Sequence, residues 1–173
     1  MPTQGIDFAR LSMKDALDLA ILVEEEARDR YRELAEQMTQ FHTPVAAFLF
    51  EKMARNEELH RAELLKRRAE ACGDEPATVS RAMLFDVEAP EYDEARAFMT
   101  QRAAVEVALK SEIKAYEFFS GLIGKHEDKL ISSLFEQLAR EEMGHQALLR
   151  AELERLPPED NVQGDVGDEP VAL

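Results

Sequence analysis

The chain has 173 residues, 45% of them hydrophobic and 33% charged, and its formal net charge at pH 7 is -15. This length suits a single domain with its own hydrophobic core, because domains are typically about 100 to 150 residues long. So acidic a surface argues against binding to nucleic acid or to an anionic membrane, since phosphate groups repel it.

The N-terminal residues lack the layout of a signal peptide, because charged residues such as Asp7 and Arg10 interrupt each apolar run. Ser12 followed by Asp15 is typical of a helix cap, and apolar residues then recur at helical spacing. This pattern predicts a first helix from about Met13 to Thr39.

The sequence His-Thr-Pro at residues 42–44 provides a threonine cap and a first-turn proline for a second helix. We expect this helix to end near Cys72 and Gly73 and, after so short a turn, to lie antiparallel to the first. Cys72 is the only cysteine, which excludes an internal disulfide, an iron-sulfur cluster and rubredoxin-type iron. A reducing, cytoplasmic location fits this cysteine content.

The segment from Asp74 to Met99 has no sustained helical pattern, and its prolines interrupt it twice. We expect a long crossover here, with a short helix near Glu91 to Phe98.

Two more helices are predicted after the crossover. Thr100 is placed to cap a third helix that reaches about Ile123, and a fourth follows from about Lys129 to Leu156. No stretch approaches the apolar length that spans a bilayer. We expect residues 1–156 to form one all-α domain and the acidic residues 157–173 to form a disordered tail.

An internal repeat emerges when the sequence is aligned with itself. Phe50–Leu64 aligns without gaps with Phe135–Leu149, and the upstream segment Ala20–Tyr31 aligns with Ala108–Phe119. We therefore interpret the chain as two helical hairpins of one ancestral type, which can pack about a pseudo-twofold axis.

Each hairpin contributes one glutamate from its first helix and a Glu-x-x-His sequence from its second. Three residues correspond to about 300° of helical rotation, so the Glu and His of each sequence are neighbours on one helix face. The aligned positions also lie at comparable distances from their turns, so all six side chains can meet at the middle of the bundle. The predicted metal ligands are Glu24, Glu57, His60, Glu112, Glu142 and His145.

The charge of this set indicates how many cations it would hold. Four carboxylates in a dry bundle repel one another and lose hydration, which raises their pKa values. Two divalent cations would balance them. Carboxylate and imidazole together suit iron or manganese, whereas an all-oxygen set suits calcium or magnesium and thiolates suit zinc. The residues do not distinguish iron from manganese.

Other acidic and histidine residues nearby are interpreted as solvated or capping residues. Three of the glutamates are turned about 100° or 200° from the ligand positions, and a solvated helix face explains the fourth equally well. The two histidines fall at turns. These residues are Glu25, Glu26, Glu58, Glu141, His42 and His126.

The ligand pattern resembles that of the ferritin-like di-iron carboxylate proteins, and within them the rubrerythrin-like group. The resemblance covers roughly Ser12 to Leu156, and EEEARDRYRELA, which begins at Glu24, is similar to the first-helix signature of rubrerythrins. It implies a ferritin-like four-helix bundle with a long crossover between helices two and three. It also implies that the six residues hold two iron ions, with Glu57 and Glu142 as bridging carboxylates.

Two departures from rubrerythrins bear on function. Those proteins carry a further glutamate one turn after the third-helix ligand, where this chain has Ala115. They also commonly end in a rubredoxin domain, which one cysteine cannot build, so electrons would come from a separate donor protein. The ligand set is equally similar to that of bacterioferritins, but Glu58 occupies the position of their haem-binding methionine, so we expect no haem.

The resemblance implies an oxidoreductase in which dioxygen or hydrogen peroxide oxidises ferrous iron, as in a peroxidase or ferroxidase. Tyr31 and Tyr116 lie near the ligand face, where each either donates a hydrogen bond or an electron, or simply packs with its hydroxyl at a polar edge. Three alternatives stay open, namely an iron-storage protein of the bacterioferritin type without haem, a di-iron oxygenase, and a metal-stabilised scaffold without turnover. Manganese or mixed metals are also compatible, and we expect a homodimer.

Overall fold

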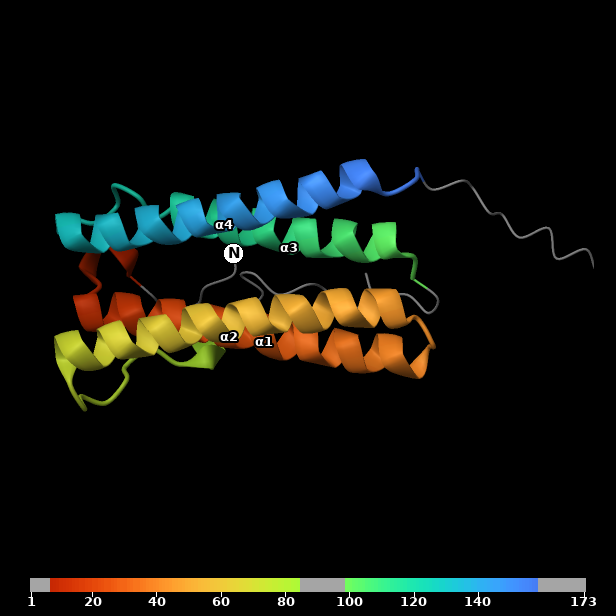
Figure 1. Ribbon diagram of the computed structural model, residues 1–173. Helices are drawn as coiled ribbons and strands as arrows, with labels where there is room; N and C mark the ends of the chain where they lie inside the picture. Colours follow the sequence, from red (N-terminus) through yellow and green to blue (C-terminus); the bar gives the residue numbers. More distant parts are fainter. Residues whose placement is uncertain (1–6, 85–98, 159–173) are drawn as a thin grey trace, which may run out of the picture.

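The computed structural model describes residues 7–84 and 99–158. Its helices are α1 (Met13–Gln40), α2 (Pro44–Cys72), α3 (Gln101–Ser120) and α4 (Lys129–Arg155), with two short 3-10 helices, η1 (Phe8–Arg10) and η2 (Arg81–Met83). In Figure 1, α1 and α2 form one antiparallel hairpin, α3 and α4 form the other, and the two hairpins lie along each other. The predicted all-α four-helix bundle is confirmed. No helix in the described ranges is long and apolar enough to cross a membrane.

Local side-chain hydrogen bonds explain where most of the helices begin. Ser12 and Asp15 form the predicted capping box, in which each side chain accepts a hydrogen bond from the backbone N–H of the other. Thr100 caps α3 by accepting from Ala103 N at 3.1 Å. Thr43 does not cap α2 through its side chain as predicted. Its hydroxyl instead donates to the Met38 carbonyl of α1 at 3.0 Å.

The helix ends differ slightly from those expected. α3 ends at Ser120 rather than near Ile123, because Gly121 caps it and Gly124, with a positive φ of 74°, turns the chain towards α4. α1 continues to Gln40, one residue beyond the predicted end, and α4 ends at Arg155. The short helix expected near Glu91 to Phe98 lies outside the described residues, as does nearly all of the predicted tail.

Buried apolar side chains form two separate clusters, one towards each end of the bundle. The first core contains Leu19, Phe119 and Phe135 together with their apolar neighbours, and the second core contains Tyr31, Phe50 and theirs. Every helix contributes to both cores, with one buried glutamate between its two contributions. The apolar packing therefore leaves a polar layer at mid-depth, where the four helices meet.

The start of the crossover is attached to the first hairpin by polar contacts. Arg68 of α2 donates from Nε to Asp18 of α1 at 2.9 Å, and Lys14 Nζ donates to Thr78 Oγ1 at 3.0 Å and to the Pro76 carbonyl at 3.1 Å. Asp18 is only 7% exposed, and Arg68 provides an opposite charge beside its buried carboxylate. The contacts hold the chain against α1 as it leaves α2.

Candidate metal centre

Four glutamates form the polar layer between the two cores, one from each helix. All four are fully buried, at 0% exposure, although glutamate is among the residues least often found inside a protein. They are Glu24 of α1, Glu57 of α2, Glu112 of α3 and Glu142 of α4.

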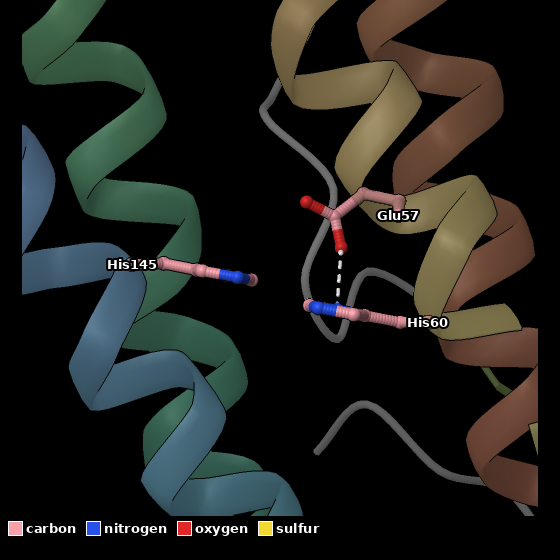
Figure 2. Close-up of side chains that lie close together, drawn as sticks. All are labelled: Glu57, His60 and His145. Atoms are coloured by element: carbon pink, nitrogen blue, oxygen red, sulfur yellow. Dashed lines mark ion pairs between the residues drawn. The ribbon is translucent and has the colours of Figure 1, made fainter. Parts of the chain in front are cut away.

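Two histidines lie in the same layer and face each other from opposite hairpins. His60 follows Glu57 by three residues on α2, and His145 follows Glu142 by three on α4, so each shares a helix face with its glutamate. The imidazole rings are parallel, with 4.9 Å between centroids and 2° between planes. Figure 2 shows them pointing across the space between the hairpins, with Glu57 above His60.

The six side chains form two half-sites, each drawn from one hairpin. In the first half-site, His60 Nδ1 lies 3.7 Å from carboxylate oxygens of both Glu24 and Glu57.

In the second half-site, His145 Nδ1 lies 2.9 Å from Glu112 Oε2 and 3.5 Å from Glu142 Oε2. His145 also connects the two halves, because its ligand atoms lie within 4.8 Å of those of Glu57 and His60 as well as those of Glu112 and Glu142. The structure thus brings all six sequence-predicted ligands together.

Most of the buried carboxylate oxygens lack a hydrogen-bond partner within the described part of the chain. Both oxygens of Glu24, Glu57 and Glu142 are in this state, as is His60 Nδ1. An isolated buried carboxylate is too costly to be retained for stability alone, since native proteins pair nearly all such groups. These orphaned atoms fit a pair of divalent cations, which would coordinate the oxygens and offset the four negative charges.

Burial raises the pKa of Glu57 well above its usual range, and although the adjacent histidine lowers it, the carboxylates of Glu112 and Glu24 raise it further. Burial likewise raises the pKa of Glu142, with the same two carboxylates adding to the effect. Both shifts mean that charged carboxylates are unfavourable here without a nearby positive charge.

The pKa values of the two histidines are also raised, which in their case favours the charged form. Contact with Glu24 and Glu57 raises the pKa of His60 to about 10. Burial lowers the pKa of His145, but its contacts with Glu112 and Glu142 outweigh this and raise the pKa to about 11. Without metal, the imidazolium ions therefore provide part of the positive charge, and a metal ion must displace these protons to bind.

The two tyrosines predicted near the ligands have different surroundings. The Tyr31 hydroxyl is buried and donates to Glu112 Oε1 at 3.0 Å, so Tyr31 of the first hairpin contacts a ligand of the second. Tyr116 is partly buried and packs against the first core. Ala115, at the position where the resemblance to rubrerythrins implies a further glutamate, is fully buried.

Sequence reasoning did not select Gln146, which is 6% exposed and donates from Nε2 to the Glu112 backbone carbonyl at 3.1 Å. It also missed Ser111, a buried hydroxyl beside Glu112. The sequence pattern that could have identified both residues is a polar side chain on the buried helix face, directly next to a predicted ligand. In the repeat, Gln146 aligns with Arg61, so the alignment gives no indication that Gln146 contacts a ligand residue.

The residues interpreted as solvated or capping lie away from the two half-sites. Glu58 pairs with Arg28 at 2.8 Å and Arg61 at 3.0 Å, and Glu141 accepts from the Gln137 amide at 2.8 Å. His42 has a left-handed φ of 57° in the turn after α1, and His126 accepts from Asp128 N at 2.9 Å. Glu25 and Glu26 are partly exposed on α1.

Comparison with known proteins agrees with this geometry. The family model described as Rubrerythrin matches residues 15–153, with a second match over residues 103–169. The fold is similar to the crystal structure of an uncharacterized conserved protein from Magnetospirillum magnetotacticum MS-1, with a TM-score of 0.68 and 27% sequence identity. That match covers 87% of this chain and 99% of the other. No curated protein matches the chain.

Proposed function

The chain belongs to the rubrerythrin family, and from this premise we propose that it binds two iron ions between its hairpins and acts as an oxidoreductase that reduces hydrogen peroxide. One observation carries the proposal. Four fully buried glutamates and two histidines face one another, and six of the carboxylate oxygens have no hydrogen-bond partner among the described residues.

Each half-site would hold one ion through its histidine and the glutamate of its first helix. Glu57 and Glu142, whose four oxygens have no hydrogen-bond partner among the described residues, would help to hold both ions. The set provides four negative charges and two neutral imidazoles, which suits two ferrous ions and leaves coordination positions for a small oxidant.

Ferrous iron bound here would supply one electron per ion, which together with two protons converts hydrogen peroxide into two molecules of water. The protein's own contribution is to position the ligands and to exclude bulk water. The two apolar cores close the layer from both ends, and Tyr31 orients Glu112 through its 3.0 Å hydrogen bond. The Tyr31 hydroxyl would also provide a proton donor directly beside this ligand oxygen.

Ala115 favours a second candidate, in which dioxygen is the oxidant. The resemblance to rubrerythrins implies that their additional glutamate accepts an iron that changes position during peroxide reduction. A buried alanine offers no such ligand, so only the six predicted ligands would hold the ions. Such a set is compatible with oxidation of ferrous iron by dioxygen, as in a ferroxidase.

Anaerobic loading with ferrous iron, followed by mixing with peroxide or dioxygen, tests both candidates. We expect about two iron ions per chain and faster oxidation by peroxide than by dioxygen. A larger rate constant for dioxygen would select the ferroxidase. Binding of fewer than about two ions per chain, with no increase on further loading, would rule out the dinuclear centre itself.

A further inference from the structure

A pocket of about 270 Å³ lies between the first half of α2 and the last part of α4, directly beside the candidate metal centre. In Figure 1 this is where α2 begins and α4 ends, both on the face towards the viewer. His145 forms part of its wall, so the pocket and the ligand cluster have this residue in common.

The interior of the pocket is mainly apolar. Met53 and Leu149 are buried at its base, at 4% and 5% exposure. Val45, Phe48 and Leu148 also line it, yet remain 51%, 63% and 69% exposed. Large apolar side chains gathered around a hollow indicate an interaction site, because leaving them hydrated is unfavourable.

The polar residues at one end of the pocket are largely paired with each other. Gln101 donates to Glu152 Oε1 at 3.1 Å, and Arg155 lies 3.7 Å from Glu152 Oε2. These groups satisfy one another and so provide little recognition of a charged ligand. Lys52 and Asn56 also line the pocket, and the rest of the surface that remains for binding is hydrocarbon together with His145.

We infer that this pocket binds the apolar group of an organic hydroperoxide and places its O–O bond beside His145, so that alkyl or aryl hydroperoxides are substrates of the centre. The inference rests on the proposed peroxide reduction. Hydrogen peroxide is small and strongly hydrated, so an apolar pocket gives it no binding energy. An apolar cavity of about 150 Å³ holds benzene, so a pocket of about 270 Å³ accommodates an aryl-alkyl group.

The reaction balances without any further reagent in a single turnover. The O–O bond of R–O–O–H breaks, two electrons come from two ferrous ions that become ferric, and two protons come from solvent. The products are the alcohol R–O–H and one water molecule. Renewal of ferrous iron would require a separate one-electron donor, which the single-turnover experiment avoids.

The first experiment measures binding without turnover. The probe is 2-phenyl-2-propanol, the unreactive alcohol formed from cumene hydroperoxide, added to the metal-free protein and followed by NMR. We expect saturable binding that Leu148→Asn weakens about 10-fold, the loss typical of removing one apolar contact. Leu59→Asn is the matched control, since Leu59 is equally exposed at 69% but does not line the pocket.

The second experiment compares single-turnover rate constants of ferrous-loaded protein with cumene hydroperoxide and with hydrogen peroxide, under anaerobic conditions. The rate constant with cumene hydroperoxide should be the larger of the two. Its ratio to the rate constant with hydrogen peroxide should fall about 10-fold in Leu148→Asn. Leu59→Asn should leave the ratio unchanged.

The outcomes separate this inference from the proposed function. Hydrogen peroxide reduction without alcohol binding, or an unchanged ratio in Leu148→Asn, would overturn the inference and leave the function intact. Alcohol binding without reduction of either peroxide would reject both the function and the substrate class. A dimer that dissociates in Leu148→Asn and binds no alcohol would assign the surface to a second copy of the chain, which also overturns the inference.

Discussion

The two half-sites have aligned sequences but unequal internal organisation. In the second half-site, Glu112 is in contact with the Tyr31 hydroxyl at 3.0 Å and with His145 at 2.9 Å, and Gln146 donates to its backbone carbonyl. In the first half-site, Glu24 has no hydrogen-bond partner among the described residues, and His60 Nδ1 lies 3.7 Å away.

One aligned pair explains much of this difference. Tyr31 aligns with Phe119, so the hydroxyl that reaches across the hairpins to Glu112 has no counterpart that could reach Glu24. A ligand held in place before metal binding loses less conformational freedom when the metal arrives. We therefore expect the second half-site to bind its metal ion more tightly than the first.

The largest effect should come from Glu57 and Glu142, the two glutamates proposed to bind both metal ions. Glu57→Gln and Glu142→Gln keep side-chain size but remove a negative charge, so the affinity for iron should fall more than about 100-fold, beyond the 10- to 100-fold cost typical of outer-shell changes. The Tm of the metal-free protein should rise by about 2–4 °C, because a buried carboxylate is removed. Metal analysis and calorimetry measure these effects.

Glu141→Gln is the control for that pair, since Glu141 neighbours Glu142 but lies outside the layer and contacts Gln137. It should change neither the iron affinity nor the Tm. Two irons per chain in both Glu57→Gln and Glu142→Gln would contradict the assignment of a shared centre.

The Tm of the metal-free protein should depend on pH, and the two half-sites should contribute differently to this dependence. The folded-state pKa values of His60 and His145 are raised from 6.5 to about 10 and about 11, so their stabilisation is complete below pH 6.5 and is lost as pH rises to those values. The Tm should therefore decrease above pH 6.5. The Tm should decrease less with pH in His145→Gln than in His60→Gln, because the pKa of His145 is raised further.

Iron affinity should change in the opposite direction over the same pH range. The histidines must lose their protons to bind metal, so affinity increases with pH. Calorimetric Tm measurements between pH 6 and 10, with and without metal, check both trends. A metal-free Tm that increases over this range would show that the histidines are not held by the carboxylates.

Tyr31→Phe should make the second half-site resemble the first. Loss of the hydroxyl leaves Glu112 Oε1 without its donor, which should lower the free energy of unfolding of the metal-free protein by about 2 kcal/mol. The affinity of the tighter metal ion should fall about 10-fold, towards that of the weaker one. Isothermal titration with a divalent metal resolves the two affinities.

Tyr116→Phe is the comparison for this variant, because Tyr116 packs against the first core. If it changes iron oxidation as much as Tyr31→Phe does, Tyr116 contributes to the reaction. If it has no effect, packing explains its position.

The smallest effect at the second half-site should come from Gln146→Leu. It removes the hydrogen bond to the Glu112 backbone carbonyl, which should cost about 1 kcal/mol in the free energy of unfolding. Arg61→Leu alters the aligned position, where the ion pair with the 37% exposed Glu58 should contribute less than about 1 kcal/mol. Denaturant unfolding measures both variants, and an equal or larger loss in Arg61→Leu would mean that Gln146 does not support the second half-site.

The sequence alone determined the helices, the pairing into hairpins and the six side chains that meet. Helical spacing decides which residues share a face of one helix, and the repeat placed Glu57 and His60 beside Glu142 and His145. Boundaries were less certain, as at α3, where Gly121 and Gly124 end the helix earlier than its apolar pattern indicated.

Only the tertiary structure decided the features that depend on contact between the hairpins. Tyr31 and Glu112 are 81 positions apart in sequence, and the pocket beside His145 is formed by helices from both hairpins. Sequence periodicity describes each helix separately and carries no information about the distance and rotation of one helix against another. Those are set by packing of the two cores, which gives the ligands of one half-site more hydrogen-bond partners than those of the other although both have the same ligand pattern.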